Sequence, residues 1–214
     1  MLHELSIHTG KSGQLPTIAR RFAEETLPLR RPLGGTFRGA WTAEFGLLNS
    51  LFTLWEFADA ADQQATAAGL IETPDWMSHA RSLTPLLDGI RTFLLKPHRP
   101  IVRRPDESRM YDFRIYDIKP YHADEYAQLF AGVMPVREKH SKNFCVWTSI
   151  ADNAHRVVHL WGYDDPDQRL RVRAAVAAEP EWKAFVANVF PLIVKQRSSL
   201  LRPVPNLVEP SVQP

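Results

Sequence analysis

The sequence predicts an α+β fold made of two tandem repeats that pack sheet against sheet. A shift of 106 residues, the separation of Trp55 and Trp161, brings the first half of the chain onto the second. The positions that coincide include aromatic, proline and basic residues: Trp41 and Trp147, Trp55 and Trp161, Pro74 and Pro180, Trp76 and Trp182, and the segments 91–97 and 197–203. A repeat of this length indicates two structural units of about 100 residues each.

The first copy opens with a strand and a helix. Residues 2–8 have the pattern of a strand, and Gly10 and Gly13 are expected to turn the chain. Apolar residues at helical spacing then predict a helix over 18–27. Pro28 is expected to end this helix, because proline lacks the N–H that a continuing helix uses.

A hairpin, two helices and a last strand complete the first copy. They are predicted as strands at 36–44 and 49–57, a helix at 59–71, a helix from Thr73 onward and a strand at 91–96. Gly46 is expected to supply the hairpin turn between the two central strands. Pro74 marks the start of the fourth helical stretch, since proline is favoured in the first turn of a helix.

The second copy repeats these elements in the same order. They are predicted at 110–117, 122–134, 143–150, 155–163, 166–178, 179–190 and 197–202. The domain boundaries that follow are 1–98 for the first repeat, 99–108 for a linker rich in proline and charge, 109–203 for the second repeat and 204–214 for a proline-rich, extended tail.

The order strand-helix-strand-strand-helix-strand is that of a ferredoxin-like unit, an antiparallel sheet with helices on one face. The other face of such a sheet is bare and needs a cover. Two copies in one chain can cover each other, so we expect a closed barrel with the helices outside.

Composition excludes several classes of protein. The net charge of +2 gives no field that would favour nucleic acid. Cys145 is the only cysteine, which excludes an internal disulfide and predicts a buried, inert thiol. No apolar run reaches membrane-spanning length, and because a strand pattern begins at Leu2 we expect no leader sequence. We therefore expect a cytoplasmic protein without nucleic-acid or membrane partners.

Several short motifs, found in both copies, resemble the NIPSNAP family. They are the run 41–49, Leu54-Trp55-Glu56-Phe57 and Pro74-Asp75-Trp76 in the first copy, and the runs 159–163 and 179–182 in the second. The resemblance implies a dimeric α/β-barrel fold of ferredoxin-like units. That superfamily also includes cofactor-free monooxygenases, haem-degrading enzymes, lactone isomerases and stress-response proteins. The resemblance brings no catalytic motif, and the second copy has Ile150, Asp152 and His155 in place of Glu44, Gly46 and Asn49.

Strand periodicity separates two faces in each copy. One face of the strand at 155–163 carries Val158 and Leu160, and the other carries His159, Trp161 and Tyr163. We expect the aliphatic face to meet the helices and the mixed polar and aromatic face to look into the barrel. Such an interior would have the composition of a small-molecule site.

The candidate site residues come from this mixed face and from the hairpin. His159 is the candidate general base or haem ligand, and Arg114 is the second candidate catalytic residue. Candidate ligand-binding residues are Trp161, Tyr163, Tyr116, Asp112, Trp55, Glu44 and Asn49. The alternatives are structural: core packing for the tryptophans, a hydrogen-bonded structural role for His159, an internal ion pair between Arg114 and Asp112, and a turn role for Glu44 and Asn49.

No metal or cofactor is predicted. His155 and His159 lie four residues apart on a strand, which separates their backbones by roughly 13 Å, too far for a shared ion. The sequence also contains no glycine-rich phosphate loop and no nucleophile elbow.

Three functions remain open. The first is binding of an unknown small molecule in the barrel interior, with a cofactor-free oxygenase or isomerase as its enzymatic form. The second is a non-enzymatic interaction or scaffold protein, which would have an interior filled by side chains and an exposed apolar patch on its helices. The third is haem binding or degradation. A homodimer in addition to the internal pairing of repeats is left open.

Overall fold

The computed structural model describes residues 1–151, 154–205 and 207, and both halves have the predicted order of strands and helices. The first half contains β1 (Leu2–Gly10), α1 (Leu15–Arg21), η1 (Phe22–Thr26), α2 (Leu27–Arg30), η2 (Arg31–Leu33), β2 (Thr36–Phe45), β3 (Ser50–Phe57), α3 (Ala60–Glu72), α4 (Pro74–Leu83), η3 (Thr84–Leu86) and β4 (Leu87–Pro97). After η4 (Pro105–Glu107), the second half contains β5 (Met110–Ile118), α5 (Ala123–Glu138), β6 (Lys142–Ser149), β7 (Arg156–Tyr163), α6 (Pro166–Ala178), α7 (Pro180–Val189), η5 (Phe190–Leu192) and β8 (Ile193–Pro203).

The strands form a closed barrel in the order β1-β3-β2-β8-β5-β7-β6-β4, and every neighbouring pair is antiparallel. Two seams join the halves, one between β2 and β8 and the other between β4 and β6. The expected closed barrel is therefore confirmed. The pairing at the two seams is short and covers residues 95–97 of β4 and residues 200–203 of β8.

The barrel interior is a single apolar core to which both halves contribute. Leu5 and Ile7 of β1 share this core with Phe113 and Ile115 of β5. Across the barrel, the rings of Phe52 and Phe113 meet edge to face with their centres 5.1 Å apart. A barrel of eight strands has an interior that side chains can fill, and most of this one is filled.

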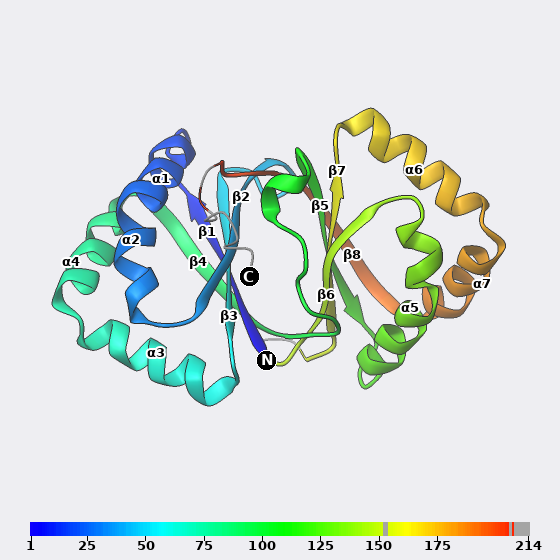
Figure 1. The fold of residues 1–214 in the computed structure, drawn as a ribbon, viewed down its shortest axis with the longest axis horizontal. Helices are drawn as coiled ribbons and strands as arrows, with labels where there is room; N and C mark the ends of the chain where they lie inside the picture. Colours follow the sequence, from blue (N-terminus) through cyan, green and yellow to red (C-terminus); the bar gives the residue numbers. More distant parts are fainter. Residues whose placement is uncertain (152–153, 206, 208–214) are drawn as a thin grey trace, which may run out of the picture.

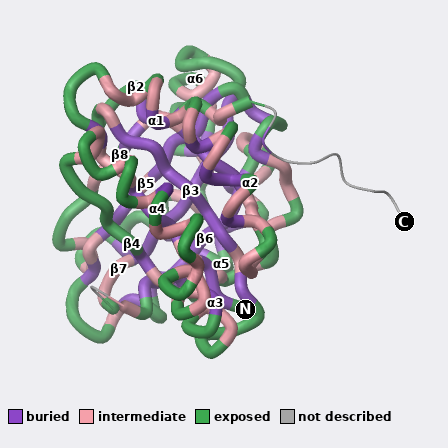
Figure 2. Tube along the Cα trace, turned by 90° about the vertical axis from the view of Figure 1, so that its left-hand side faces the viewer, coloured by how far each residue is buried: buried purple, intermediate pink, exposed green. Residues whose placement is uncertain are grey.

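The helices cover the outside of the barrel in two groups, one from each half (Figure 1). Two further cores lie beneath them: Ile18 and Phe22 pack on Trp55 in the first half, and Phe130 and Phe185 pack on Trp161 in the second. Figure 2 shows the consequence, with buried strands at the centre and exposed segments at the periphery.

The first helical stretch does not end at Pro28, so this prediction is wrong. The π-helical segment η1 intervenes, and the helical backbone continues through Pro28, which lies in the first turn of α2. The π turn also accommodates one extra residue. Arg30 lies eight positions after Phe22, whereas its counterpart Arg137 lies seven positions after Phe130, and both guanidinium groups still stack 4.3 Å from a tryptophan ring of their own half.

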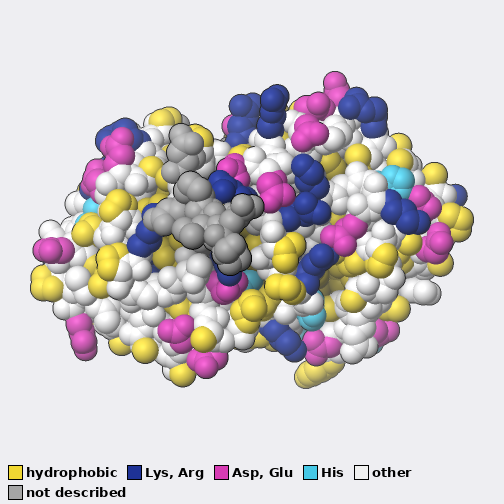
Figure 3. Space-filling model, viewed as in Figure 1, with side chains coloured by type: hydrophobic (Ala, Val, Ile, Leu, Met, Phe, Trp, Pro, Cys, Tyr) yellow, Lys and Arg dark blue, Asp and Glu magenta, His cyan; other side chains and the backbone are white. Residues whose placement is uncertain are grey.

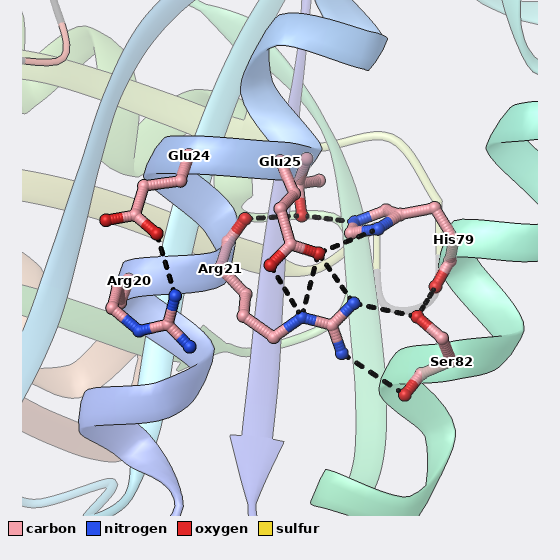
Figure 4. A network of polar contacts seen from close by, with 7 residues as sticks. Arg20, Arg21, Glu24, Glu25, His79 and Ser82 are labelled. Atoms are coloured by element: carbon pink, nitrogen blue, oxygen red, sulfur yellow. Dashed lines mark hydrogen bonds and ion pairs between the residues drawn. The ribbon is translucent and has the colours of Figure 1, made fainter.

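A polar network fastens this widened helix to α4 (Figure 4). Arg21 donates to Glu25 at 2.7 Å and to the Ser82 hydroxyl at 2.8 Å. The Thr26 hydroxyl is 2.7 Å from Nε2 of His79, whose Nδ1 lies 3.5 Å from Glu25. Burial and the charge of Arg21 lower the pKa of His79. These contacts give the π-helical segment a fixed partner on the neighbouring helix.

Gly46 and Asn49 form the β2–β3 turn, as predicted for Gly46. Both have left-handed backbone angles, with φ of 89° and 56° respectively. A Cβ atom at Gly46 would lie 2.4 Å from the Ser199 hydroxyl and 2.7 Å from the Ser198 carbonyl oxygen. Glycine is therefore required at this position both by its backbone angle and by the close approach of β8.

The end of the chain and its surface complete the description. Of the tail predicted at 204–214, residues 206 and 208–214 lie outside the described residues, whereas Leu207 is buried against the core of the first half. Basic and acidic side chains are interspersed on the face drawn in Figure 3. None of the helices in the described ranges is long and apolar enough to cross a membrane.

Candidate functional site

The assignment of strand faces made from the sequence is wrong. Val158 and Leu160, expected under the helices, belong to the core inside the barrel, whereas Trp161 and Tyr163, expected inside it, pack under the helices of their own half. Trp55 does the same in the first half. The reason is that the inner faces of the two half-sheets meet only each other in a closed, dry space, so the more apolar faces lie there. The outer faces receive polar partners from the helices.

The structure nevertheless brings six of the candidate residues together on this outer face. We call them the second-half cluster: Asp112, Arg114, Tyr116, His159, Trp161 and Tyr163. Asp112 is fully buried and accepts hydrogen bonds from Arg114 at 2.7 Å, from Arg169 of α6 at 2.8 Å and from Ser198 of β8 at 2.6 Å. The ion pair considered as a structural alternative for Arg114 is thus present.

The electrostatics of Asp112 follow from these contacts. Burial by itself would raise the pKa of this carboxyl. The charge and hydrogen bond of Arg114, with smaller contributions from Ser198 and Arg169, outweigh burial and lower the pKa to about 2. Asp112 therefore joins β5 to α6 and β8 as a carboxylate at neutral pH.

His159 is held as a neutral imidazole. Its Nδ1 accepts a hydrogen bond from the indole N–H of Trp161 at 2.7 Å, which places the ring proton on Nε2. Burial and the nearby charge of Arg114 keep the pKa of His159 well below its usual value. Its Nε2 and the Nε of Arg114, which is paired with His159 across β5 and β7, have no hydrogen-bond partner among the described residues.

His159 is enclosed by aromatic rings. The ring of Tyr116 meets it edge to face with centres 4.9 Å apart, and the ring of Phe130 lies 5.2 Å away. A pocket of about 310 Å³ beside α5 is lined by Phe130 and Val146 but not by His159. The second-half cluster is thus a packed polar core, and its geometry fits the structural alternative for His159.

The remaining candidate residues lie apart from this cluster. Trp55 is stacked against Arg30 under the helices of the first half. Glu44 is exposed on β2 and forms a 3.2 Å ion pair with Arg202. Asn49 adopts the positive φ that the hairpin turn needs, in line with the turn role considered for it.

A pocket that the sequence did not predict opens at one end of the barrel. It has a volume of about 480 Å³. We call it the mouth pocket, and it is lined by Gly46, Leu47, Arg91, Phe93, Phe113, Ile115, Arg156, Arg197, Ser198 and Ser199. Phe93, Phe113 and Ile115 belong to the buried core inside the barrel, so the floor of the pocket is apolar.

Three arginines surround this floor. Arg156 and Arg197 donate to the same carboxylate, that of Asp117, at 2.9 and 2.6 Å. The guanidinium of Arg156 also lies 5.4 Å from the centre of the Phe93 ring. The side chain of Arg91 forms no hydrogen bond or ion pair with the residues described here. Among the described lining residues none is acidic, so the pocket presents a cationic rim over an apolar floor.

A signal for this pocket is present in the sequence. Each arginine lies two residues before a residue on the inner face of the same strand: Arg91 before Phe93, Arg156 before Val158 and Arg197 before Ser199. With a period of two, each arginine shares the face of that residue. The three strands come from different parts of the chain, so only the strand order shows that they meet at one end.

The other end of the barrel is closed. Ile101, from the segment between the two halves, packs against the core inside the barrel, and the hydroxyl of Tyr111 donates to the carbonyl of Pro105 at 2.9 Å. Near this end Nδ1 of His3 accepts a hydrogen bond from the indole N–H of Trp147 at 2.7 Å. The mouth pocket therefore lies at the opposite, open end. In the described ranges no group of three His, Cys, Asp or Glu side chains could hold a metal ion.

Comparison of the sequence with known proteins identifies the family to which the chain belongs. The sequence profile of the NIPSNAP family matches residues 3–100 and again residues 111–207. The chain belongs to the NIPSNAP family. Among curated NIPSNAP proteins, it is 32% identical over 130 residues to NipSnap homolog 3B of Mus musculus, covering 56% of this chain and 53% of that protein. It is 25% identical over 213 residues to the NipSnap homolog of Dictyostelium discoideum, covering 95% of this chain and 87% of that protein.

The chain thus spans about half the length of the mouse relative and 32% of a Caenorhabditis elegans NipSnap protein. Solved structures similar to this NIPSNAP chain include an anthrone oxidase-like protein, with a TM-score of 0.68 and 12% identity over 94% of this chain and 90% of that one. A candidate monooxygenase of Fusobacterium nucleatum has a TM-score of 0.66 and 12% identity over 95% of this chain and 92% of that one. At these identities the likeness shows a shared α/β fold.

Proposed function

We propose that this NIPSNAP protein binds a small molecule in the mouth pocket of its barrel. The observation that carries the proposal is a pocket of about 480 Å³ whose floor is apolar and whose rim is polar, at the open end of an otherwise filled barrel. Such a volume is within the range of small-molecule sites, and apolar walls with a few oriented polar groups are their usual composition. The location in the barrel agrees with the sequence-based hypothesis, but the residues are different.

The proposal is for binding, with chemistry as an extension of it. Among the described residues that line the pocket there is no His, Cys, Asp or Glu that could act as a base or nucleophile. A cofactor-free oxygenase or isomerase, the enzymatic form that the family resemblance implies and that the names of the structural neighbours also suggest, would therefore depend on the reactivity of the bound molecule itself. Incubation of the identified ligand with the protein in air, followed by product analysis, tests this extension.

Two observations bear on the alternatives. The interior below the pocket is filled by side chains, as the interaction hypothesis expects, so a protein without any bound molecule would favour that hypothesis. Haem binding through His159 finds no support in the geometry, because this ring is enclosed by Tyr116 and Phe130. We retain the interaction hypothesis as the second outcome of the test.

The proposal includes the architecture behind the pocket. We interpret each half as a ferredoxin-like unit and the whole as an internal pseudo-dimer, supported by the repeated element order and by the two seams between the halves. The pocket then lies where the two units meet, with Arg91 and Arg197 as equivalent positions. A cytoplasmic location and a further homodimer remain predictions.

Native mass spectrometry of the protein purified from its own host tests the proposal directly. A stoichiometric bound molecule is expected, and it should be lost when Ile115→Phe or Leu47→Phe fills the pocket from two different sides. Ile71→Phe, at a position 69% exposed on α3, is the matched control and should retain it. A clean mass for the wild-type chain, or retention of the molecule by both filled variants, would contradict the proposal.

A further inference from the structure

Resting on the proposed function, we propose that the ligand is an aromatic monocarboxylate, with its ring on the apolar floor of the mouth pocket and its carboxylate at Arg91. The three arginines of the rim differ in their surroundings. Arg156 and Arg197 are already oriented by Asp117, whereas the side chain of Arg91 forms no hydrogen bond or ion pair within the described ranges. A guanidinium without a partner can form a bidentate pair with a carboxylate.

The repeat explains why Arg91 is left without a partner. Arg91 and Arg197 are equivalent under the shift of 106 residues, and each lies opposite an inner-face isoleucine of the neighbouring strand, Ile7 or Ile115. By strand pairing, the first-half position equivalent to Asp117 is Thr9, because Thr9 pairs with Gly89 as Asp117 pairs with Lys195. The hydroxyl of Thr9 lies 3.3 Å from that of Ser50. The acid that holds Arg197 therefore has no counterpart at Arg91, and the two sides of the pocket are electrostatically different.

The floor favours an aromatic body. The ring of Phe113 already meets that of Phe52 edge to face, with centres 5.1 Å apart. The guanidinium of Arg156 lies 5.4 Å from the centre of the Phe93 ring. Aromatic rings prefer such edge-to-face and offset contacts with one another, and these contacts add to the hydrophobic gain of burial. A flat ring system can make the same contacts with Phe93 and Phe113 where they line the pocket.

The spacing of floor and rim fits an aryl carboxylate. Arg91 and Phe93 lie two residues apart on the same face of β4, so their backbone positions are separated by about 7 Å. A carboxylate attached directly to a two-ring body spans a similar length, so it can reach Arg91 while the rings remain on the floor. A neutral analogue would keep the floor contacts and lose the ion pair.

The test compares naphthalene-2-carboxylate with naphthalene-2-carboxamide, which have the same shape but different charge. Isothermal titration of both probes is made on the wild-type chain, on Arg91→Gln and Arg91→Lys, and on Arg171→Gln as a control at an exposed arginine of α6. In the wild type the acid should bind about tenfold or more tightly than the amide, because a hydrogen-bonded ion pair with arginine is among the stronger polar contacts. Added salt should weaken binding of the acid alone.

The variants separate the two proposals. Arg91→Gln should remove the preference for the acid, Arg91→Lys should keep part of it, and Arg171→Gln should keep all of it although the net charge falls by the same amount. Equal affinities of acid and amide in the wild type, or a preference that survives Arg91→Gln, would overturn the carboxylate assignment while leaving pocket binding in place. Failure of both probes to bind would overturn the aromatic assignment, whereas pocket binding itself is decided by the native mass spectrometry of the wild-type and filled variants.

Discussion

Replacing Asp112 by asparagine should destabilise the protein strongly, because this carboxylate is the only acid that Arg114 and Arg169 contact in the described structure. Its side chain is fully buried and accepts three hydrogen bonds of 2.6 to 2.8 Å, two of them from these guanidinium groups. Asparagine keeps the shape and an acceptor oxygen but leaves the arginines without a counter-charge.

The magnitude follows from two routes, of which the pKa gives the lower value. Removal of one partner of a buried ion pair costs on the order of 3 kcal/mol or more. Independently, the pKa of Asp112 is lowered from 3.8 to about 2, which corresponds to about 2 kcal/mol of stability at neutral pH. We therefore expect Asp112→Asn to lower the free energy of unfolding by about 2–3 kcal/mol at pH 7, a large part of the usual stability of a protein.

The pH dependence gives the sharper test. Because the pKa is lower in the folded state, the contribution of Asp112 is complete above its unfolded value of 3.8 and is lost as the pH falls towards 2. The difference between wild type and Asp112→Asn should therefore shrink as the solution is acidified through this window. Urea unfolding followed by tryptophan fluorescence, from pH 7 to pH 2, measures it.

The control is Asp88→Asn at an exposed position of β4, which should change the stability by less than about 0.5 kcal/mol. A loss below about 1 kcal/mol for Asp112→Asn at pH 7 would refute the reasoning. So would a difference between the two proteins that stays constant down to pH 2.

Three other predictions test separate features. Gly46→Ala should lower the stability by about 1–2 kcal/mol, because of its φ of 89° and the close approach of β8, whereas Gly89→Ala, with no atom within 4 Å of the added Cβ, should be nearly neutral in thermal unfolding. Cys145 should resist Ellman's reagent until urea is added, because burial raises the pKa of its thiol, and rapid labelling of the folded protein would contradict this. The nitrogen NMR spectrum of His159 should show a neutral ring with the proton on Nε2 at pH 6, since burial lowers its pKa and Trp161 donates to Nδ1; a charged ring at that pH would contradict it.

Much of the fold could be predicted because the order of strands and helices follows from local periodicity and from the repeat. The alternation of β3 and β7, the helical spacing around Phe22 and the glycine at the hairpin turn each reflect a local requirement of the backbone. The closed barrel followed from the need of each half-sheet to cover a bare face. Pro28 was misread because a π turn is set by contacts with α4 and the sheet, which no local pattern of residues reveals.

The candidate site was predicted only in part. The second-half cluster was found because polar residues that share a strand face do lie together, as Asp112 and Arg114 do. The structural role of these residues was not predicted, because the strand face that could have lined a cavity is covered by Phe130 and α6. The mouth pocket was missed because Arg91, Arg156 and Arg197 lie on three strands that are distant in sequence.

The sequence by itself determined the two repeats, the order of their elements and the two faces of every strand, since these depend on neighbouring residues and on the period of the backbone. The tertiary structure alone decided which face became the interior and which residues met at the mouth of the barrel. The physical reason is that burial depends on what covers a surface: each half-sheet places its aliphatic face against its counterpart, and the arginines of three strands become one site only when the barrel closes.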